Sequence, residues 1–306
     1  LVEPSISVAA LEERERVAVI EKLASNMKAA LFEVGTAGIS AAEGKLEVCV
    51  DASKVEQCFV KLRRLFGISY VGTRRIRARG PGGLPLGFRS RVLALVSGGI
   101  DSAVAAWMLM RKGHPITGLF AYFPLGGDES DIKRFVEVMK VLKEWHIGEP
   151  IRAYVFKHKH SIETFHEVGY SYTCVLCRRM MYRVASEVAR AVDAVAVVTG
   201  ENLAQVASQT LDNLYAISEA CNLLVLRPLI GMDKREIVAT AERIGTLGAS
   251  ISKVGATCAS RNGCCWAAPR KPVTKASLRK VRELEAKLDI ESLLKESLKS
   301  LLEIRL

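Results

Sequence analysis

The segment Val92-Leu-Ala-Leu-Val-Ser-Gly-Gly-Ile-Asp-Ser102 decides the fold class of this 306-residue chain. Its first five residues form a continuous apolar run, which is typical of a strand covered on both faces of a parallel sheet. Two glycines follow, and residues 101–112 then have the pattern of a helix. In open α/β sheets, ligands bind at the carboxyl ends of the strands. The segment therefore predicts a strand, a binding loop and a helix, in that order.

Strands and helices alternate from this segment to about residue 244. The apolar runs predict further strands at residues 116–123, 151–156, 195–199 and 223–227. Helical periodicity predicts helices at residues 131–146, 174–192, 205–214 and 234–244. Strands separated by helices imply a parallel sheet with right-handed crossovers, so we expect an α/β domain.

The Ser-Gly-Gly-Ile-Asp-Ser loop has the residue types of a phosphate site. Gly98 and Gly99 allow the backbone to approach a phosphate closely, and the helix that follows offers unpaired N–H groups. Hydroxyl donors come from Ser97 and Ser102. No lysine follows the glycines, so this is not the GxxxxGK[ST] loop. The alternative is a simple turn in which Asp101 only caps the helix; the strand before and the helix after favour a phosphate-binding loop.

The chain before this segment predicts a smaller α+β domain. Helices are expected at residues 17–32 and 55–66, and strands at residues 45–50 and 68–73. Residues 76–90 are rich in Gly, Pro and Arg, which predicts a basic linker. We expect domains at 1–75 and 91–275, followed by a helical tail at 276–306. An apolar stripe (Leu278, Val281, Leu284, Leu288) should pack this tail onto the main domain.

Composition excludes disorder and a membrane span. Hydrophobic residues make up 49% and charged residues 25%, which is enough to bury a core. No apolar run approaches the ~20 residues that a spanning helix needs. The first twelve residues lack the basic start and apolar centre of a signal peptide. A cytoplasmic protein is the expectation.

The positive charge is concentrated in one stretch. The net charge is +11, from 44 Lys and Arg against 33 Asp and Glu. Nine basic and no acidic residues lie between Lys61 and Arg91: Lys61, Arg63, Arg64, Arg74, Arg75, Arg77, Arg79, Arg89 and Arg91. This basic strip (residues 61–91) could bind the phosphates of a nucleic acid, or it could be a solvated surface.

The eight cysteines are too sparse for a disulfide scaffold. Three of them, Cys49, Cys58 and Cys221, have apolar neighbours and predict core positions. Cys174 and Cys177 stand three residues apart at the start of a predicted helix, which would lower their thiol pKa, as would Arg178 and Arg179. From spacing alone the pair could be metal ligands, a redox pair or a coincidence. In the segment Lys157-His-Lys-His160, we expect His158 and His160 to lie on a solvated basic edge of a strand.

The S-G-G-x-D-S loop resembles the pyrophosphate loop (PP-loop) of ATP pyrophosphatases. Three further motifs look like the tRNA 4-thiouridine synthases, the ThiI family: Thr199-Gly-Glu-Asn-Leu-Ala-Gln-Val-Ala-Ser-Gln-Thr-Leu-Asp-Asn-Leu214, Cys177-Arg-Arg-Met-Met181 and Leu226-Arg-Pro-Leu-Ile-Gly-Met-Asp-Lys234. The first block is similar to that family's N-terminal ferredoxin-like domain through Glu21-Lys-Leu-Ala-Ser-Asn-Met-Lys-Ala-Ala-Leu31 and Leu65-Phe-Gly-Ile68. The resemblance implies a PP-loop ATP pyrophosphatase domain preceded by a small ferredoxin-like domain.

The resemblance also implies an ATP site. The matching nucleotide-binding positions are Leu95, Val96, Ser97, Gly98, Gly99, Asp101, Ser102, Arg178, Gly200 and Gln209. Asp101 would in addition bind Mg²⁺. Lys234 matches a functional lysine that could neutralise charge on the departing phosphate. Without the resemblance, Lys234 would be read as a surface lysine at a helix start.

For the cysteines, the resemblance implies sulfur chemistry. Cys265 matches the family's sulfur-carrying position and, with Cys174 and Cys177, would give a three-thiolate iron–sulfur site with one open iron. A redox or persulfide pair and a zinc site are the alternatives, since zinc would need a fourth ligand. Cys264 or, less well, Cys258 could replace Cys265 as the third ligand.

The expected enzyme is an ATP-dependent tRNA sulfurtransferase in which Asp101, Lys234, Cys174, Cys177 and Cys265 are catalytic. The chain departs from the family pattern in two ways: we expect neither the RNA-binding THUMP core before the loop nor a rhodanese domain after Leu306. The partners expected are tRNA, held by the basic strip, and a sulfur donor, either sulfide or a cysteine desulfurase persulfide; a homodimer is also considered. The alternatives are a sulfurtransferase with a non-tRNA acceptor and a non-catalytic, nucleotide-dependent RNA-binding module.

Overall fold

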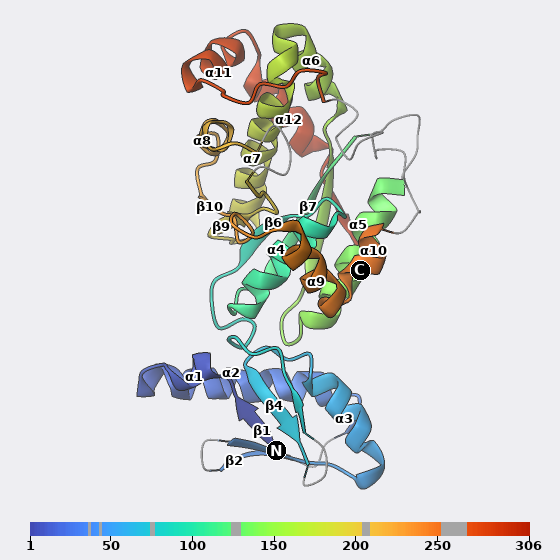
Figure 1. Ribbon diagram of the computed structural model, residues 1–306. Helices are drawn as coiled ribbons and strands as arrows, with labels where there is room; N and C mark the ends of the chain where they lie inside the picture. The colour runs from blue at the N-terminus through green and yellow to red at the C-terminus, as the bar shows by residue number, and fades with distance from the viewer. Residues whose placement is uncertain (36–37, 43–44, 74–76, 124–129, 204–208, 252–267) are drawn as a thin grey trace. The chain divides into compact units, whose positions relative to one another are not determined.

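The computed structural model describes the chain except for residues 36–37, 43–44, 74–76, 124–129, 204–208 and 252–267 (Figure 1). The chain divides into two compact units. The first contains Leu1–Arg91, Trp107–Ile116 and Leu142–Ile151. The second contains Val92–Ala106, Thr117–Val141 and Arg152–Leu306. The domain boundaries expected from the sequence stay a prediction.

The first unit is built on a five-stranded antiparallel sheet. The strands lie in the order β2 (Gly38–Ala42), β3 (Lys45–Cys49), β1 (Val2–Pro4), β4 (Ile68–Gly72) and β5 (Arg77–Arg79). The short helix α1 (Ile6–Ala9) and the long helix α2 (Glu13–Leu31) connect β1 to β2, and α3 (Val55–Leu62) connects β3 to β4. This is the β-α-β-β-α-β order of ferredoxin-like folds with one added strand, so the predicted fold class of this block is confirmed.

The apolar face of α2 forms the core of this unit. Leu23, Met27 and Leu31 are fully buried and share one cluster with Leu46 of β3 and Ile68 of β4. Their spacing of four residues places them on one side of the helix. The sequence therefore predicted α2 correctly, whereas the three-residue strands β1 and β5 are too short to give a pattern. β5 lies within the stretch expected as a linker.

The second unit is built on a six-stranded sheet. The order is β10 (Leu224–Leu226), β9 (Ala196–Val198), β6 (Val92–Leu95), β7 (Ile116–Tyr122), β8 (Arg152–Lys157) and β11 (Leu302–Ile304). β10 is parallel to β9, β9 to β6, and β7 to β8. Every residue of β6 and β7 is buried, as expected for strands covered on both faces. The α/β class with a parallel sheet is confirmed.

Helices separate these strands along the chain. They are α4 (Ile100–Arg111), α5 (Ser130–Trp145), α6 (Lys159–Gly169), α7 (Thr173–Ala191), α8 (Leu211–Ser218), α9 (Lys234–Ile244) and α10 (Thr246–Ile251). Val184 and Val188 of α7 share the core with Leu93, Leu119 and Val197 of the sheet. α8 begins at Leu211, where Thr210 caps it by accepting a hydrogen bond from the Asn213 amide. Residues 205–208 of the helix predicted at 205–214 lie outside the described residues. Within the part of the chain described, no helix has the length and apolar composition that a membrane span requires.

The tail differs from the prediction of a helical segment. Two helices, α11 (Leu278–Glu285) and α12 (Ile290–Lys299), are followed by the strand β11, which pairs antiparallel with β8. Two residues of the predicted apolar stripe are buried: Val281 is 0% exposed and Leu284 is 4% exposed. Both belong to the core cluster that contains Val184 and Val188 of α7. The strand was missed because three residues at the edge of a sheet carry little periodic signal.

Candidate active site

The predicted phosphate loop follows β6 and is held by its own hydroxyl groups. Ser102 Oγ accepts a hydrogen bond from the Ser97 amide at 3.1 Å and donates one to the Gly99 carbonyl at 3.2 Å. Gly98 has a φ of +74°, a conformation that glycine adopts without strain. These contacts fix the loop at the start of α4, where the unpaired N–H groups of the helix can receive an anion.

Lys234 lies beside this loop, although 133 residues separate it from Asp101. Its Nζ donates to Asp101 Oδ1 at 2.5 Å. Lys234 is the first residue of α9, which is capped by Asp233 and Glu236 through reciprocal hydrogen bonds. Asn202 supports the approach to this helix, because its side-chain amide donates to the Met232 carbonyl at 2.5 Å. The fold thus brings two of the predicted catalytic residues together.

Gly200 and Glu201 connect the loop to α7. A Cβ on Gly200 would lie 2.5 Å from the Ser102 amide nitrogen, so only glycine fits there. The next residue, Glu201, accepts hydrogen bonds from Arg178 at 2.6 Å and from Arg227 at 2.7 Å. Burial opposes ionisation of this carboxyl group, but the two guanidinium charges hold the pKa of Glu201 below its ordinary value. Arg178, predicted as a nucleotide contact, is therefore paired with an acid that the prediction had not assigned.

Cys177 is close to His158, which corrects the expectation for this histidine. His158 is 1% exposed, and its Nε2 lies 3.4 Å from Cys177 Sγ. Phe123, Phe156 and Phe165 surround the imidazole ring. The solvated-edge prediction was wrong for His158, because the chain turns inward where β8 ends. His160 lies in α6, and its side chain is exposed.

Burial also reverses the expected shift in thiol pKa. It raises the pKa of Cys177 to about 12 and lowers the pKa of His158 to about 4, so both groups are neutral at pH 7. The helix N-terminus and Arg178 were expected to favour the thiolate, but desolvation is the larger effect. Arg179, also expected to add charge near the thiols, instead bonds to Glu285 and Glu219.

The two cysteines of the predicted pair lie near the start of α7, with Cys174 in its first turn and Cys177 one turn further along the helix. Cys258, Cys264 and Cys265 lie outside the described residues. The chain that follows Cys265 is anchored near the pair, because the Val273 amide donates to the Ser171 carbonyl at 3.0 Å. The buried Asn213 also holds this stretch through Val273 and Ala276.

Three more residues predicted to bind the nucleotide, Leu95, Val96 and Gln209, are buried. The side chains of Leu95 and Val96 are buried, and the Val96 amide already donates to the Leu119 carbonyl. Gln209 is 8% exposed, and its Oε1 has no hydrogen-bond partner among the residues described. This unused acceptor is the feature of Gln209 that best suits a ligand contact.

In the first unit, intramolecular ion pairs engage part of the basic strip. Lys61 pairs with Glu33 at 3.3 Å, and Arg77 with Glu3 at 2.7 Å. Arg64 pairs with Glu144. Arg74 and Arg75 lie outside the described residues. The number of charges that could meet phosphates is therefore smaller than the sequence count.

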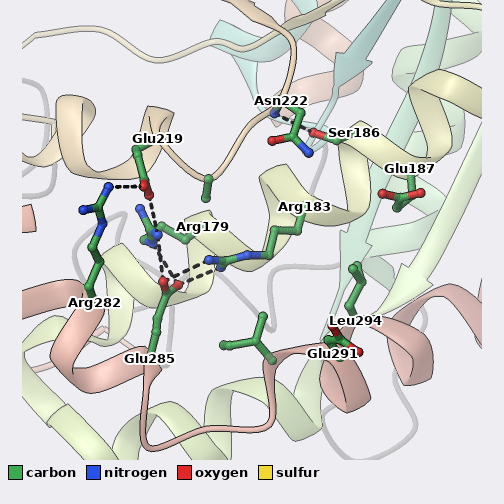
Figure 2. Close-up of a pocket in the computed structure, with 12 residues that line it drawn as sticks. Arg179, Arg183, Ser186, Glu187, Glu219, Asn222, Arg282, Glu285, Glu291 and Leu294 are labelled. Atoms are coloured by element: carbon green, nitrogen blue, oxygen red, sulfur yellow. Dashed lines mark hydrogen bonds and ion pairs between the residues drawn. The ribbon is translucent and has the colours of Figure 1, made fainter.

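A second cluster of charges, the Glu285 network, lies further along α7 (Figure 2). Glu285 of α11 accepts two hydrogen bonds from Arg179 at 2.8 and 2.7 Å, and two from Arg183 at 2.7 and 2.9 Å. Glu219 joins Arg179 to Arg282. The network borders a pocket of about 420 Å³ between α7 and the tail. It binds the tail to the helix that carries the cysteines.

Sequence reasoning missed Glu201 and His158 as members of the site. His158 directly follows β8, and Glu201 lies three residues after the end of β9, at the sheet edge where α/β proteins bind ligands. That position was the available signal. Their partners, Arg178 and Cys177, come from a different element and could not be assigned from spacing.

Comparison with known proteins now adds to this geometry. The family model described as "Thiamine biosynthesis protein (ThiI)" matches residues 87–290, which contain the loop, Lys234 and all five candidate site cysteines. The chain belongs to the ThiI family. The predicted family resemblance is confirmed.

Several ThiI relatives have curated names. A probable tRNA sulfurtransferase of Methanosarcina mazei is 31% identical over 297 residues, 95% of this chain and 70% of the relative. One from Thermus thermophilus is 44% identical over 225 residues, 73% of this chain and 53% of the relative. A third, from Caldanaerobacter subterraneus, is 37% identical over 57% of its own length. The chain thus spans little more than half of the latter two relatives.

A solved structure shares the ThiI fold of the whole chain. The crystal structure of a 4-thiouridine synthetase–RNA complex with bound ATP has a TM-score of 0.86 and 24% identity, and the match covers 99% of this chain and 98% of that one. PH1313 from Pyrococcus horikoshii matches with a TM-score of 0.56 and 14% identity over 80% of this chain. At these identities the likeness establishes the fold.

Proposed function

We propose that this chain uses ATP to thiolate a uridine of tRNA, giving 4-thiouridine. The observation that supports this most directly is the run of contacts from the phosphate loop to Cys177. Gly200 packs on Ser102, Glu201 binds Arg178, and Arg178 follows Cys177 in α7. A nucleotide site and a thiol site are thereby linked through consecutive residues. Relatives named tRNA sulfurtransferase support the same reaction.

The first step is adenylation. ATP phosphates would lie on the loop amides of Gly98 and Gly99, and the uridine O4 attacks the α-phosphate. A bond forms between O4 and the α-phosphorus, the bond from that phosphorus to the bridging oxygen breaks, and pyrophosphate leaves. The uridine N3 loses its proton to solvent in this step, and hydrosulfide supplies a proton in the next. Lys234 would offset the negative charge that builds up on the phosphates. Asp101, whose carboxylate Lys234 holds, would be the oxygen ligand for Mg²⁺.

The second step is substitution at C4. Hydrosulfide attacks this carbon, a C–S bond forms, and the C–O bond breaks as AMP leaves with the oxygen. The base is neither oxidised nor reduced, so sulfide needs no added reductant. Adenylation is required because an unactivated oxygen is a poor leaving group.

The thiols suit a role in delivering sulfur. Cys174 and Cys177 stand one turn apart, which fits a pair of ligands on one helix face. The residues described contain no group of three side chains placed to bind a metal ion, and Cys265 is our proposed third ligand. These three cysteines would hold an iron–sulfur cluster, whose open iron supplies a binding position for sulfide.

Recognition of tRNA is assigned to the first unit. The solved 4-thiouridine synthetase is bound to RNA. Arg63 and Arg79 of the basic strip are exposed. Arg79 lies beside an aromatic ring, since its Nε donates to the Tyr70 hydroxyl at 3.5 Å. Exposed arginines beside an aromatic ring are suited to RNA, because they can bind phosphates and stack on bases.

The test is anaerobic incubation of the chain with unmodified tRNA, Mg-ATP and sulfide, followed by mass spectrometry of the nucleosides. We expect 4-thiouridine, accompanied by pyrophosphate. Asp101→Asn should reduce both products about 100- to 1000-fold, because it removes the carboxylate that would bind Mg²⁺ and that holds Lys234 beside the loop. Cys177→Ser should retain pyrophosphate release and lose 4-thiouridine.

Cys221→Ser is the matched control, since Cys221 also packs on α7 but lies beside Ser186, away from the loop. It should leave both products unchanged. If the chain without substitutions released pyrophosphate but formed no thiolated nucleoside, tRNA would be excluded as the acceptor. Loss of both products in Cys177→Ser, with Cys221→Ser active, would contradict the division of roles between the loop and the thiols.

A further inference from the structure

The second turn of α5 packs directly on the phosphate loop. A Cβ built on Gly98 would lie 3.1 Å from the Phe135 amide nitrogen and 3.2 Å from Arg134 Cγ. The stem of the Arg134 side chain therefore lies over the middle of the loop. Both residues belong to the second compact unit, as does the whole loop.

The guanidinium group of Arg134 is held toward the start of α5. Its Nη2 donates to Asp131 Oδ1 at 2.8 Å, one helical turn before it. Helical side chains lean toward the N-terminus of their helix, so this direction is the natural one. α5 follows β7, and α4 with the loop follows β6, the neighbouring strand of the sheet. The side-chain stem of Arg134 thus lies beside Gly98, and its guanidinium group is directed toward the first turn of α5.

The hydrogen bonding of Arg134 is incomplete. The side chain is 19% exposed, and its Nε is buried with no hydrogen-bond partner among the described residues. A buried N–H without an acceptor is unfavourable, and native proteins rarely leave one. Arg179, by comparison, uses Nε and both terminal nitrogens. Within the described part of the chain, Arg134 therefore has an unused N–H donor, and its side chain packs on the phosphate loop.

We propose that Arg134 is a further anion-binding residue of the loop, which contacts the pyrophosphate portion of the nucleotide. The inference rests on the proposed binding of ATP at this loop. A guanidinium group is suited to this role because its planar donors match two phosphate oxygens. Asp131 orients the group and leaves Nε for the ligand. Lys234 approaches from α9 and Arg134 from α5, so the leaving pyrophosphate would meet positive charge from two elements.

The test measures binding of inorganic pyrophosphate, Mg-ATP and AMP to the full chain by calorimetry. Arg134→Ala should weaken pyrophosphate and ATP binding about 10- to 100-fold, the range for charge-assisted hydrogen bonds. AMP has no β- or γ-phosphate, so its affinity should change less than about twofold. Arg134→Lys should recover part of the loss, because it restores the charge without the planar donors.

Lys133→Ala is the matched control. It removes the same charge from the neighbouring, exposed position of α5 and should leave all three affinities unchanged. If Arg134→Ala does not fold, the affinities of Arg134→Gln and Arg134→Lys for the same three ligands are compared with those of Lys133→Ala. The assignment would be overturned if Arg134→Ala weakened the binding of AMP as much as that of ATP. It would also be overturned if the variants at 133 and 134 lowered pyrophosphate affinity equally. An unmodified chain that binds neither pyrophosphate nor ATP would instead overturn the proposed function.

Discussion

The second compact unit contains two clusters of acidic and basic side chains that differ in how completely they are paired. At the phosphate loop, Asp101 and Lys234 are joined by one hydrogen bond, and their side chains are 25% and 52% exposed. In the Glu285 network, the side chain of Arg179 is 2% exposed, and that of Glu285 10%. Each nitrogen of Arg179 that can donate has an acceptor within the chain.

The difference separates charges that serve the ligand from charges that serve the fold. A guanidinium group whose donors are all used within the chain has nothing left for a substrate. Removing one partner from such a buried pair leaves an uncompensated charge in a poorly solvated place. A half-exposed lysine with one bond can instead exchange its partner for a phosphate at little cost. Burial and unused donors, rather than charge itself, distinguish the two clusters.

The largest effect should come from breaking the buried cluster. Glu285→Gln leaves Arg183 without its counter-charge and leaves Arg179 with Glu219 alone, and we expect the free energy of unfolding to fall by about 3–5 kcal/mol. Asp101→Asn should lower it by less than about 1 kcal/mol, because that pair is partly exposed. Urea unfolding of both variants checks the contrast.

Glu283→Gln is the control for the first of these variants, since Glu283 lies on the same helix and makes only exposed pairs with Arg279 and Lys280. It should be almost as stable as the unmodified chain. Equal stability losses in the variants at 285 and 101 would remove the distinction between the two clusters.

The first unit contains a buried histidine, His146, whose two ring nitrogens are both hydrogen-bonded. His146 is 4% exposed; its Nε2 accepts from the Ile116 amide, and its Nδ1 donates to the Glu149 carbonyl, both at 3.0 Å. It is fully paired as a neutral ring. Burial lowers the pKa of His146 to about 4, so the unfolded chain takes up this proton at a higher pH than the folded one.

The stability that neutral His146 contributes is therefore complete above about pH 6.5 and is lost as the pH falls toward 4. The loss should reach about 3 kcal/mol, from a pKa difference of about 2.5 units. Urea unfolding between pH 7.5 and 4.5 measures it. His146→Gln cannot titrate and should show a shallower decline. A decline of the same slope in this variant would assign the pH dependence to other groups.

The long elements could be predicted from the sequence because their periodic patterns are strong. The buried strands β6 and β7 and the helices α7 and α9 are within a few residues of their predicted bounds. β9 and β10 have only three residues each, but they lie in apolar runs and were predicted. β1, β5 and β11 are equally short and each contains a charged residue, so they form no apolar run, and their pairing depends on distant strands. The same holds for the site. Spacing and resemblance predicted Gly98 and Asp101 as loop residues and Lys234 as a functional lysine, but a motif contains no information about a contact such as that of His158 with Cys177.

The smallest effect is expected from two ion pairs that share a helix and a geometry. On α5, Lys140 pairs with Glu137 and Arg134 with Asp131, each three residues apart and each at 2.8 Å. Both side chains of the first pair are 53% exposed, whereas Asp131 is 9% and Arg134 19% exposed. Lys140→Ala should change the free energy of unfolding by no more than about 0.5 kcal/mol, because solvent screens the pair. It should also leave pyrophosphate affinity unchanged. Urea unfolding and calorimetry on Lys140→Ala and Arg134→Ala test this directly. A loss of affinity in Lys140→Ala equal to that in Arg134→Ala would mean that the charge of α5 as a whole, and not the buried position over Gly98, attracts the anion.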